Sequence, residues 1–244
     1  HLLNICDRYF MWGKNEKKHP KIVNLPSPKL STSSLKSSIK DNSILFLDTY
    51  FPYYPFVIKS SPTEGLMSEY TKWQYDFFNQ LDSSLRELII FRKEAQVTNW
   101  YKKRDDTTTL RRYFPEIKID DSNRITFNAM VSKSKLVVID NRQTTYIQVL
   151  LWNHPAILFW NPHDWQVRKT VFRYFEDLID AGILFTSPIN AARKLKNVYK
   201  DPEKWWRSRK VQLARNNFIN RFANSSKFWK NEWINYGKNL INEN

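Results

Sequence analysis

Four polar side chains that could face a bound ligand, Asp140, Asn141, Thr144 and Thr145, follow an apolar run at residues 136–139. Hydroxyl groups at the start of a helix, together with its unpaired backbone N–H groups, attract phosphate. The chain has only four glycines, which excludes a Gly-rich dinucleotide loop and a Walker loop. Any phosphate binding must therefore come from helix termini, hydroxyls and basic side chains. The alternative is that Thr144 or Thr145 is the N-cap of an ordinary helix.

The elements that would position these side chains form a strand, helix, strand unit. Residues 136–139 are Leu, Val, Val and Ile, which predicts a strand buried on both faces. Residues 144–152 can form a helix, Pro155 ends it, and residues 156–160 predict the next strand. In open α/β sheets ligands bind beyond the carboxyl ends of the strands, so we expect the four polar side chains to face a cleft.

Two more segments are predicted to end at the same cleft. A buried strand over residues 43–48 ends at Asp48, and the aromatic loop that follows begins with Tyr50. A strand over residues 85–91 ends at Arg92 and Lys93. If these strands are parallel, both cations point into the cleft that contains Asp48. Arg92 could instead pair with an acidic neighbour, Glu94 or Asp140.

The remaining pattern alternates strands with helices, which predicts an α/β fold: a Rossmann-like parallel sheet with helices on both faces. We expect strands at residues 5–13 and 21–25 to open this sheet, helices at 66–81, 127–132 and 166–181, and a last strand at 183–186. Residues 1–189 are predicted to form this domain, with a Ser-rich, mobile loop at 31–43. Residues 190–244 predict a basic, aromatic helical tail that packs on the sheet or crosses to another domain.

Charge points to anionic partners, because the chain carries a net charge of +15. The tail alone has 13 Lys or Arg and 4 Asp or Glu, a net charge of +9. A single cysteine excludes an internal disulfide, and no secretion signal is visible, which favours a cytoplasmic location. Residues 143–163 contain no Asp, Glu, Lys or Arg, which could suggest a membrane span. Asn153, His154 and Pro155 divide this stretch in two, so we expect a helix and a strand there and no membrane span.

A resemblance rests on motifs spread over nearly the whole chain. The motifs PSPKL, FLDTYFPYYP, IIFRKE, SKLVVIDNRQTTYIQVLLWNHPAILFWNP and AARKL resemble a bacterial family of transferases of surface-carbohydrate biosynthesis. That family is similar to the carboxyl-terminal half of a GT-B glycosyltransferase, in a layout akin to capsule Kdo transferases and CDP-glycerol glycerophosphotransferases. The resemblance implies a nucleotide-sugar donor held by this chain, and an amino-terminal domain, absent here, that contributes the glycan or glycolipid acceptor side. Thr144 and Thr145 match a Ser or Thr pair of such relatives, whereas Gln148 stands where many carry an acidic residue.

The resulting hypothesis needs neither a metal nor a cofactor, because helix dipoles and basic side chains can stabilise a departing phosphate. The donor phosphates are assigned to Thr144, Thr145, Asn141 and Arg92, and the vicinity of the sugar or base to Tyr50, Trp160, His163 and Arg168. The catalytic residue stays unknown, with three candidates: His163, Asp48 and Asp140. As alternatives, His163 caps the helix predicted at residue 166, Arg168 is an exposed helix residue, and both carboxylates bond loop amides.

Two other functions compete with this one. Abundant cations and aromatics are the signature of nucleic-acid binding, but Phe218, Phe222, Trp229 and Trp233 recur at helical spacing, which favours packing of the tail across the sheet. Alternatively, the tail binds anionic lipid and holds the enzyme at the inner face of the cytoplasmic membrane, a function compatible with glycosyl transfer.

Overall fold

The computed structural model describes residues 2–14, 19–35, 38–49, 64–93, 107–120 and 124–242. Six parallel strands form the central sheet in the order β5-β4-β3-β6-β7-β8, and two more, β1 and β2, form a separate parallel pair. The strands are β1 Tyr9–Met11, β2 Ile22–Asn24, β3 Ile44–Leu47, β4 Ile89–Arg92, β5 Lys118–Asp120, β6 Leu136–Ile139, β7 Ala156–Phe159 and β8 Leu184–Phe185.

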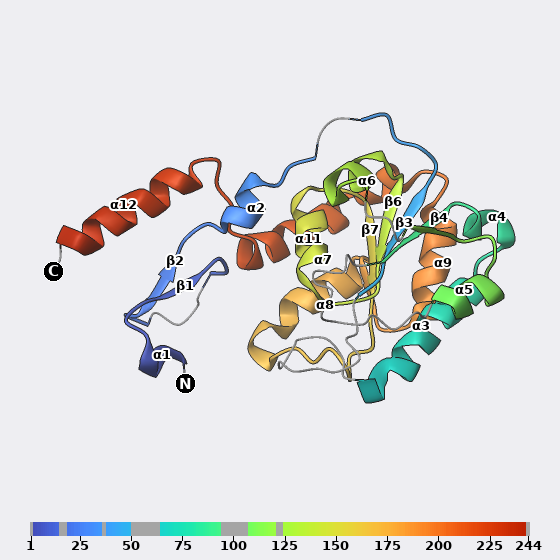
Figure 1. Cartoon of the computed structure of the whole chain (residues 1–244), viewed down its shortest axis with the longest axis horizontal. Coiled ribbons are helices and arrows are strands. Elements are labelled where there is room, and N and C mark those ends of the chain that lie inside the picture. The colour runs from blue at the N-terminus through green and yellow to red at the C-terminus, as the bar shows by residue number, and fades with distance from the viewer. Residues whose placement is uncertain are drawn as a thin grey trace.

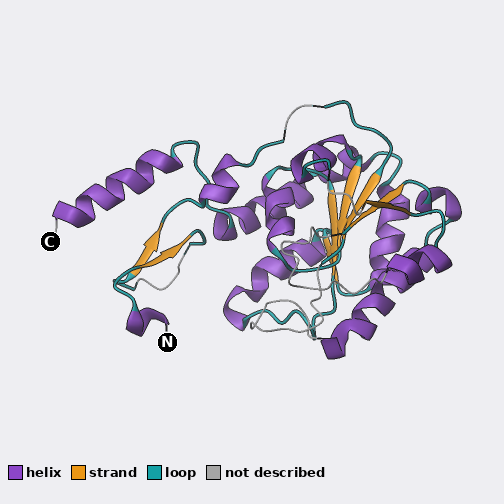
Figure 2. Ribbon diagram, in the orientation of Figure 1, coloured by secondary structure: helices purple, strands orange, loops and turns teal. Residues whose placement is uncertain are grey.

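Helices cover both faces of the central sheet, as Figure 2 shows. The α-helices are α1 Leu2–Ile5, α2 Pro28–Thr32, α3 Met67–Asn79, α4 Ser83–Arg86, α5 Thr107–Tyr113, α6 Phe127–Lys133, α7 Thr144–Leu151, α8 Phe172–Asp180, α9 Pro188–Val198, α10 Pro202–Trp206, α11 Arg209–Phe222 and α12 Trp229–Asn242. Two 3-10 helices, η1 Glu64–Leu66 and η2 Lys169–Val171, precede α3 and α8. The α/β fold class predicted from the sequence is confirmed.

Alternate side chains of the fully buried strands point to opposite faces, and each face has its own core. On one face, Val137 and Ile139 of β6 pack with α7, α8 and α11. On the other, Leu136 and Val138 pack with α3, α5 and α9. Phe46 of β3 lies at the centre of this second core. Because both faces are covered, the central strands β3, β6 and β7 are apolar throughout, which explains why runs such as residues 136–139 are recognisable in the sequence.

The carboxyl-terminal residues do not behave as one unit. Phe218 of α11 is fully buried in the core beside α7 and α8, so packing of this part on the sheet is as expected. In contrast, no residue of α12 is buried, and its Trp233 bonds the carbonyl of Pro26 and contacts Phe10 of β1. Figure 1 shows α12 beside β1, β2 and α2, away from the sheet, so the expectation that Trp229 and Trp233 pack across the sheet is wrong.

Three boundaries predicted from the sequence are also wrong. Residues 5–13 and 21–25 contribute only the short strands β1 and β2, which pair with each other and do not join the central sheet. Residues 83–86 form α4, so the strand expected from residue 85 begins at Ile89. The helix expected from residue 166 begins at Phe172, because residues 166–168 are not helical and η2 comes first.

Candidate active site

The connections of the sheet diverge between its two central strands. From β3 the chain continues to β4 and β5 on one side, whereas β6, on the other side of β3, leads to β7 and β8. Ligands of open α/β sheets bind at such a switch point, beyond the carboxyl ends of the strands. A cavity of about 500 Å³ lies at this place. Its walls are Lys29, Leu47, Asp48, Arg92, Lys93, Phe127, Asn128, Asn141, Gln143, Thr144, Thr145 and Gln148.

The strand register brings the polar turn after β6 against the end of β3. Leu47 pairs with Ile139, so Asp48 and Asp140 follow adjacent strand ends. Asn141 is 2% exposed, and its amide donates to the Leu47 carbonyl at 3.3 Å. A further bond joins Gln143 to the Thr49 hydroxyl. These contacts fix the wall of the cavity next to the start of α7.

Helix α7 presents its amino terminus to the cavity. Gln143 is the N-cap and makes no side-chain capping bond, whereas Asn141 accepts from the Gln143 backbone N–H at 3.3 Å. Thr144 and Thr145 occupy the first two helical positions, so the alternative that either is the N-cap is wrong. Both line the cavity, together with the buried Gln148 one turn later.

Cations from α2 and from the end of β4 also line the cavity. Arg92 donates to Asp120 at 3.3 Å and to the Ile125 carbonyl at 2.9 Å, so its pairing partner is Asp120 and not Asp140. Burial lowers the pKa of Arg92, and Asp120 partly opposes this change. Lys93 follows Arg92, as predicted, and Lys29 comes from α2. Sequence reasoning missed Lys29, because nothing local indicates that α2 packs near the end of β4.

The two carboxylates at the strand ends have different positions. Asp48 lines the cavity, but Asp140 does not: it is 2% exposed and lies behind, bonded by Tyr70, Gln74 and Asn141. Burial raises the pKa of Asp140 to about 6, although these three donors each act to lower it. The prediction that Asp140 faces the cleft is therefore wrong. Tyr70 and Gln74 were not predicted as site residues, since helical spacing places Tyr70 on an apolar face and says nothing of polar partners.

Other predicted residues lie elsewhere. Trp160 is 3% exposed within the core of the α7 face. His163 and Arg168 are exposed, neither lines the cavity, and the helix that His163 was thought to cap starts at residue 172. Tyr50 falls outside the described residues, as does Glu94. Asn141, Thr144, Thr145, Arg92 and Asp48 are thus brought together, and the others are not.

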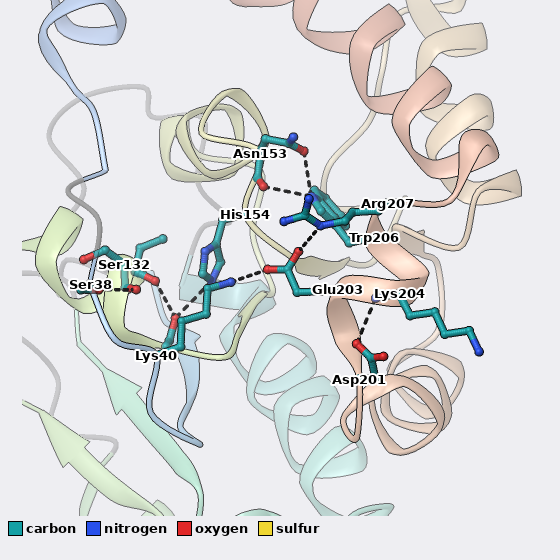
Figure 3. Close-up of polar contacts among 12 residues, drawn as sticks. Ser38, Lys40, Ser132, Asn153, His154, Asp201, Glu203, Lys204, Trp206 and Arg207 are labelled. Carbon is teal, nitrogen blue, oxygen red and sulfur yellow. Dashed lines mark hydrogen bonds and ion pairs between the residues drawn. The ribbon is translucent and has the colours of Figure 1, made fainter.

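A second polar cluster lies at the opposite edge of the sheet, where β6 and β7 begin (Figure 3). His154 is 3% exposed and lies 3.4 Å from the Ser134 hydroxyl. Burial, and then Lys40, lower the pKa of His154 to about 4, so the ring is neutral near pH 7. Lys40 in turn pairs with Glu203 of α10. His154 and Pro155 therefore lie at the amino-terminal end of β7 and do not line the cavity.

A family model described as LIC12162 family transferase matches residues 1–236. The chain belongs to this family. The description of the LIC12162 family is that of transferases, and the cavity is the candidate active site of this chain. Among the residues described above, no helix has the length and hydrophobicity to cross a membrane.

This LIC12162 family chain is also similar in fold to several solved structures. The "putative UDP-N-acetylglucosamine 2-epimerase" of Listeria monocytogenes is 14% identical, with a TM-score of 0.50, over 94% of this chain and 56% of that one. Two structures of the wall teichoic acid polymerase TagF are 18% and 14% identical, with TM-scores of 0.41 and 0.48, over 86% and 97% of this chain and 45% and 58% of theirs. The chain thus spans about half the length of these proteins. No curated protein matches.

Proposed function

We propose that this LIC12162 family transferase is a glycosyltransferase of the GT-B type, and that the chain is the half that binds a nucleotide-sugar donor. The acceptor in this proposal is a surface polysaccharide or glycolipid. The observation that carries the proposal is the convergence of the α7 amino terminus, both threonines and Arg92 on one cavity at the switch point of the sheet.

The chemistry of the walls supports this function. Transfer from a nucleotide sugar releases a nucleotide whose phosphate gains negative charge, and helix N–H groups, hydroxyls and cations stabilise that charge. Thr144, Thr145 and Arg92 supply these groups, while Phe127 adds an apolar surface against which a base can lie. The protein itself thus provides the positive potential, and we expect transfer in the presence of a metal chelator.

A second domain is part of the proposal. β1 and β2 are parallel, yet parallel sheets are normally covered on both faces, and a lone pair of strands is only marginally stable. Phe10 of β1 and Trp12, which directly follows β1, are 40% and 51% exposed. We therefore expect another domain to complete this small sheet and to hold the acceptor, at the inner face of the cytoplasmic membrane. In that case this chain alone binds donor nucleotides but transfers no sugar.

The first test is a melting-temperature screen with CMP, CDP, UDP and their sugar derivatives. A bound nucleotide raises the melting temperature. Thr144→Val and Thr145→Val should each weaken nucleotide binding about 10-fold or more, as expected for the loss of a hydrogen bond to a charged group, which contributes about 1.5–3 kcal/mol. The matched control is Thr170→Val, an exposed threonine of η2 outside the cavity.

Two results would contradict the donor-site proposal. One is an unchanged nucleotide shift in both cavity variants. The other is salt-sensitive binding of oligonucleotides without any nucleotide effect, which would favour a nucleic-acid-binding protein. We expect neither, because Phe218 is buried and Trp233 is engaged with Pro26 and Phe10, so these rings are not arranged for base stacking.

A further inference from the structure

Two carboxylates and a phenol form a continuous polar path from the cavity into the core. Asp48 lines the cavity at the end of β3, and Asp140 lies behind it at the end of β6. Tyr70 and Gln74, one turn apart on α3, each contact both carboxylates. Since α3 packs over this edge of the sheet, the path is shielded from solvent: Tyr70 and Gln74 are 6% and 4% exposed.

The distances define the order of the path. The Tyr70 hydroxyl lies 2.7 Å from Asp140 Oδ1 and 3.2 Å from Asp48 Oδ1. A phenol has one proton, so the shorter contact assigns it to Asp140, and the Tyr70 oxygen can then accept from a protonated Asp48. The Gln74 amide donates to both acids, at 2.6 Å to Asp140 and 3.1 Å to Asp48, and holds them in place.

We propose that Asp48, Tyr70 and Asp140 form a proton relay, with Asp48 as the general base that faces the acceptor hydroxyl. This inference rests on the proposed function. In the transfer step, the acceptor oxygen bonds the donor sugar carbon while the bond from that carbon to the phosphate oxygen breaks, and its electron pair leaves with the nucleotide. The hydroxyl proton passes to Asp48. A proton then moves from Asp48 to the Tyr70 oxygen as the Tyr70 proton moves to Asp140.

The surrounding charges suit this direction of transfer. Arg92 at the end of β4 and Lys93 directly after it line the cavity with Asp48, and positive charge near a carboxylate favours the ionised form that a base requires. Asp164, in the loop after β7, lines a small cavity together with Tyr70 and Asp140. Burial raises the pKa of Asp140 to about 6, so near neutral pH the carboxylate is mostly ionised and takes up a proton more readily than an ordinary aspartate would.

The relay is tested without any substrate, by following the carboxyl carbons of Asp48 and Asp140 by NMR during a pH titration. We expect each signal to show two coupled steps. Tyr70→Phe and Asp140→Asn should each leave Asp48 with a single step. The matched control is Tyr146→Phe, which removes the hydroxyl of another buried tyrosine, on the other face of the sheet. Independent single steps in the unmodified chain, or titrations that Tyr70→Phe does not change, would overturn the relay.

The general base is tested in the full-length protein with the nucleotide sugar that gives the largest melting shift. Asp48→Asn should lower kcat about 100-fold or more and leave the KM for the donor nearly unchanged. Tyr70→Phe should move the acidic limb of the pH profile, a change that a purely structural tyrosine would not cause. A kcat retained in Asp48→Asn overturns the base. If no nucleotide sugar binds, the proposed function falls and the base with it, while the titration still decides the relay.

Discussion

Replacement of Asp140 by Asn should change how stability depends on pH. The pKa of Asp140 is about 6 in the folded protein against an ordinary value of 3.8, because the carboxylate is buried. Between these values the folded state holds the proton and the unfolded state does not, so the free energy of unfolding falls as pH rises from about 4 through about 6. At about 1.36 kcal/mol per pH unit, the total fall is about 3 kcal/mol. Asp140→Asn removes it.

His154 produces the opposite slope in almost the same range. Its pKa is about 4 in the folded protein against an ordinary value of 6.5. The unfolded state then binds the proton more readily, so the free energy of unfolding rises with pH from about 4 to about 6.5, by about 3 kcal/mol. In the unmodified protein the two effects nearly cancel. We expect a rising profile in Asp140→Asn, a falling profile in His154→Gln, and a nearly flat one in the double variant.

The assay is urea unfolding followed by tryptophan fluorescence at several pH values between about 4 and about 7.5. Asp76→Asn is the control, since Asp76 is paired with Lys72 on the surface of α3. Because Asp140 and His154 lie at opposite edges of the sheet, their effects should add within about 0.5 kcal/mol. If the Asp140→Asn profile runs parallel to that of the unmodified protein, Asp140 holds no extra proton in the folded state and the reasoning fails.

Two further predictions concern packing and backbone. Leu150→Ala should lower the free energy of unfolding by about 2–5 kcal/mol, because Leu150 is fully buried. Leu213 is 59% exposed, so Leu213→Ala should change the free energy of unfolding by less than about 0.5 kcal/mol. Equal effects of the two substitutions would contradict the packing of α7. Gly182→Ala should lower it by about 1 kcal/mol or more, because Gly182 ends α8 with a φ of 68° that suits glycine, and Gly65→Ala, with open space around it, serves as the comparison in thermal melts.

The central unit of the fold could be predicted because its local signals agree. The β-branched run 136–139 and Pro155 define two strands and a helix, and the structure has all three within one residue of the expected bounds. The rule that ligands bind beyond parallel strands then brought Asn141, Thr144, Thr145 and Arg92 to one cavity, as the structure confirms. Their donor-binding roles remain predictions.

The missed features depend on contacts between distant parts of the chain. A strand pattern does not say which strands pair, so β1 and β2 could not be separated from the sheet by sequence alone. Helical spacing gave Tyr70 an apolar face, yet its hydroxyl ends at two carboxylates that follow strands far away in sequence. The position of Asp140 behind the cavity depends on the same helix. Such polar contacts follow from three-dimensional packing and leave no periodic signal.

The packing of α12 against β1 has a consequence for synthesis of the protein. Phe10 contacts Trp233 and Tyr236, and the backbone N–H of Asn224 donates to the Trp12 carbonyl, so β1 waits for partners that are translated more than 200 residues later. At ~5–20 residues per second, the delay on the ribosome is roughly 10–45 s. During that time α12 is not yet available to cover the aromatic side chains of β1, so this segment is a binding site for a chaperone that shields nascent chains.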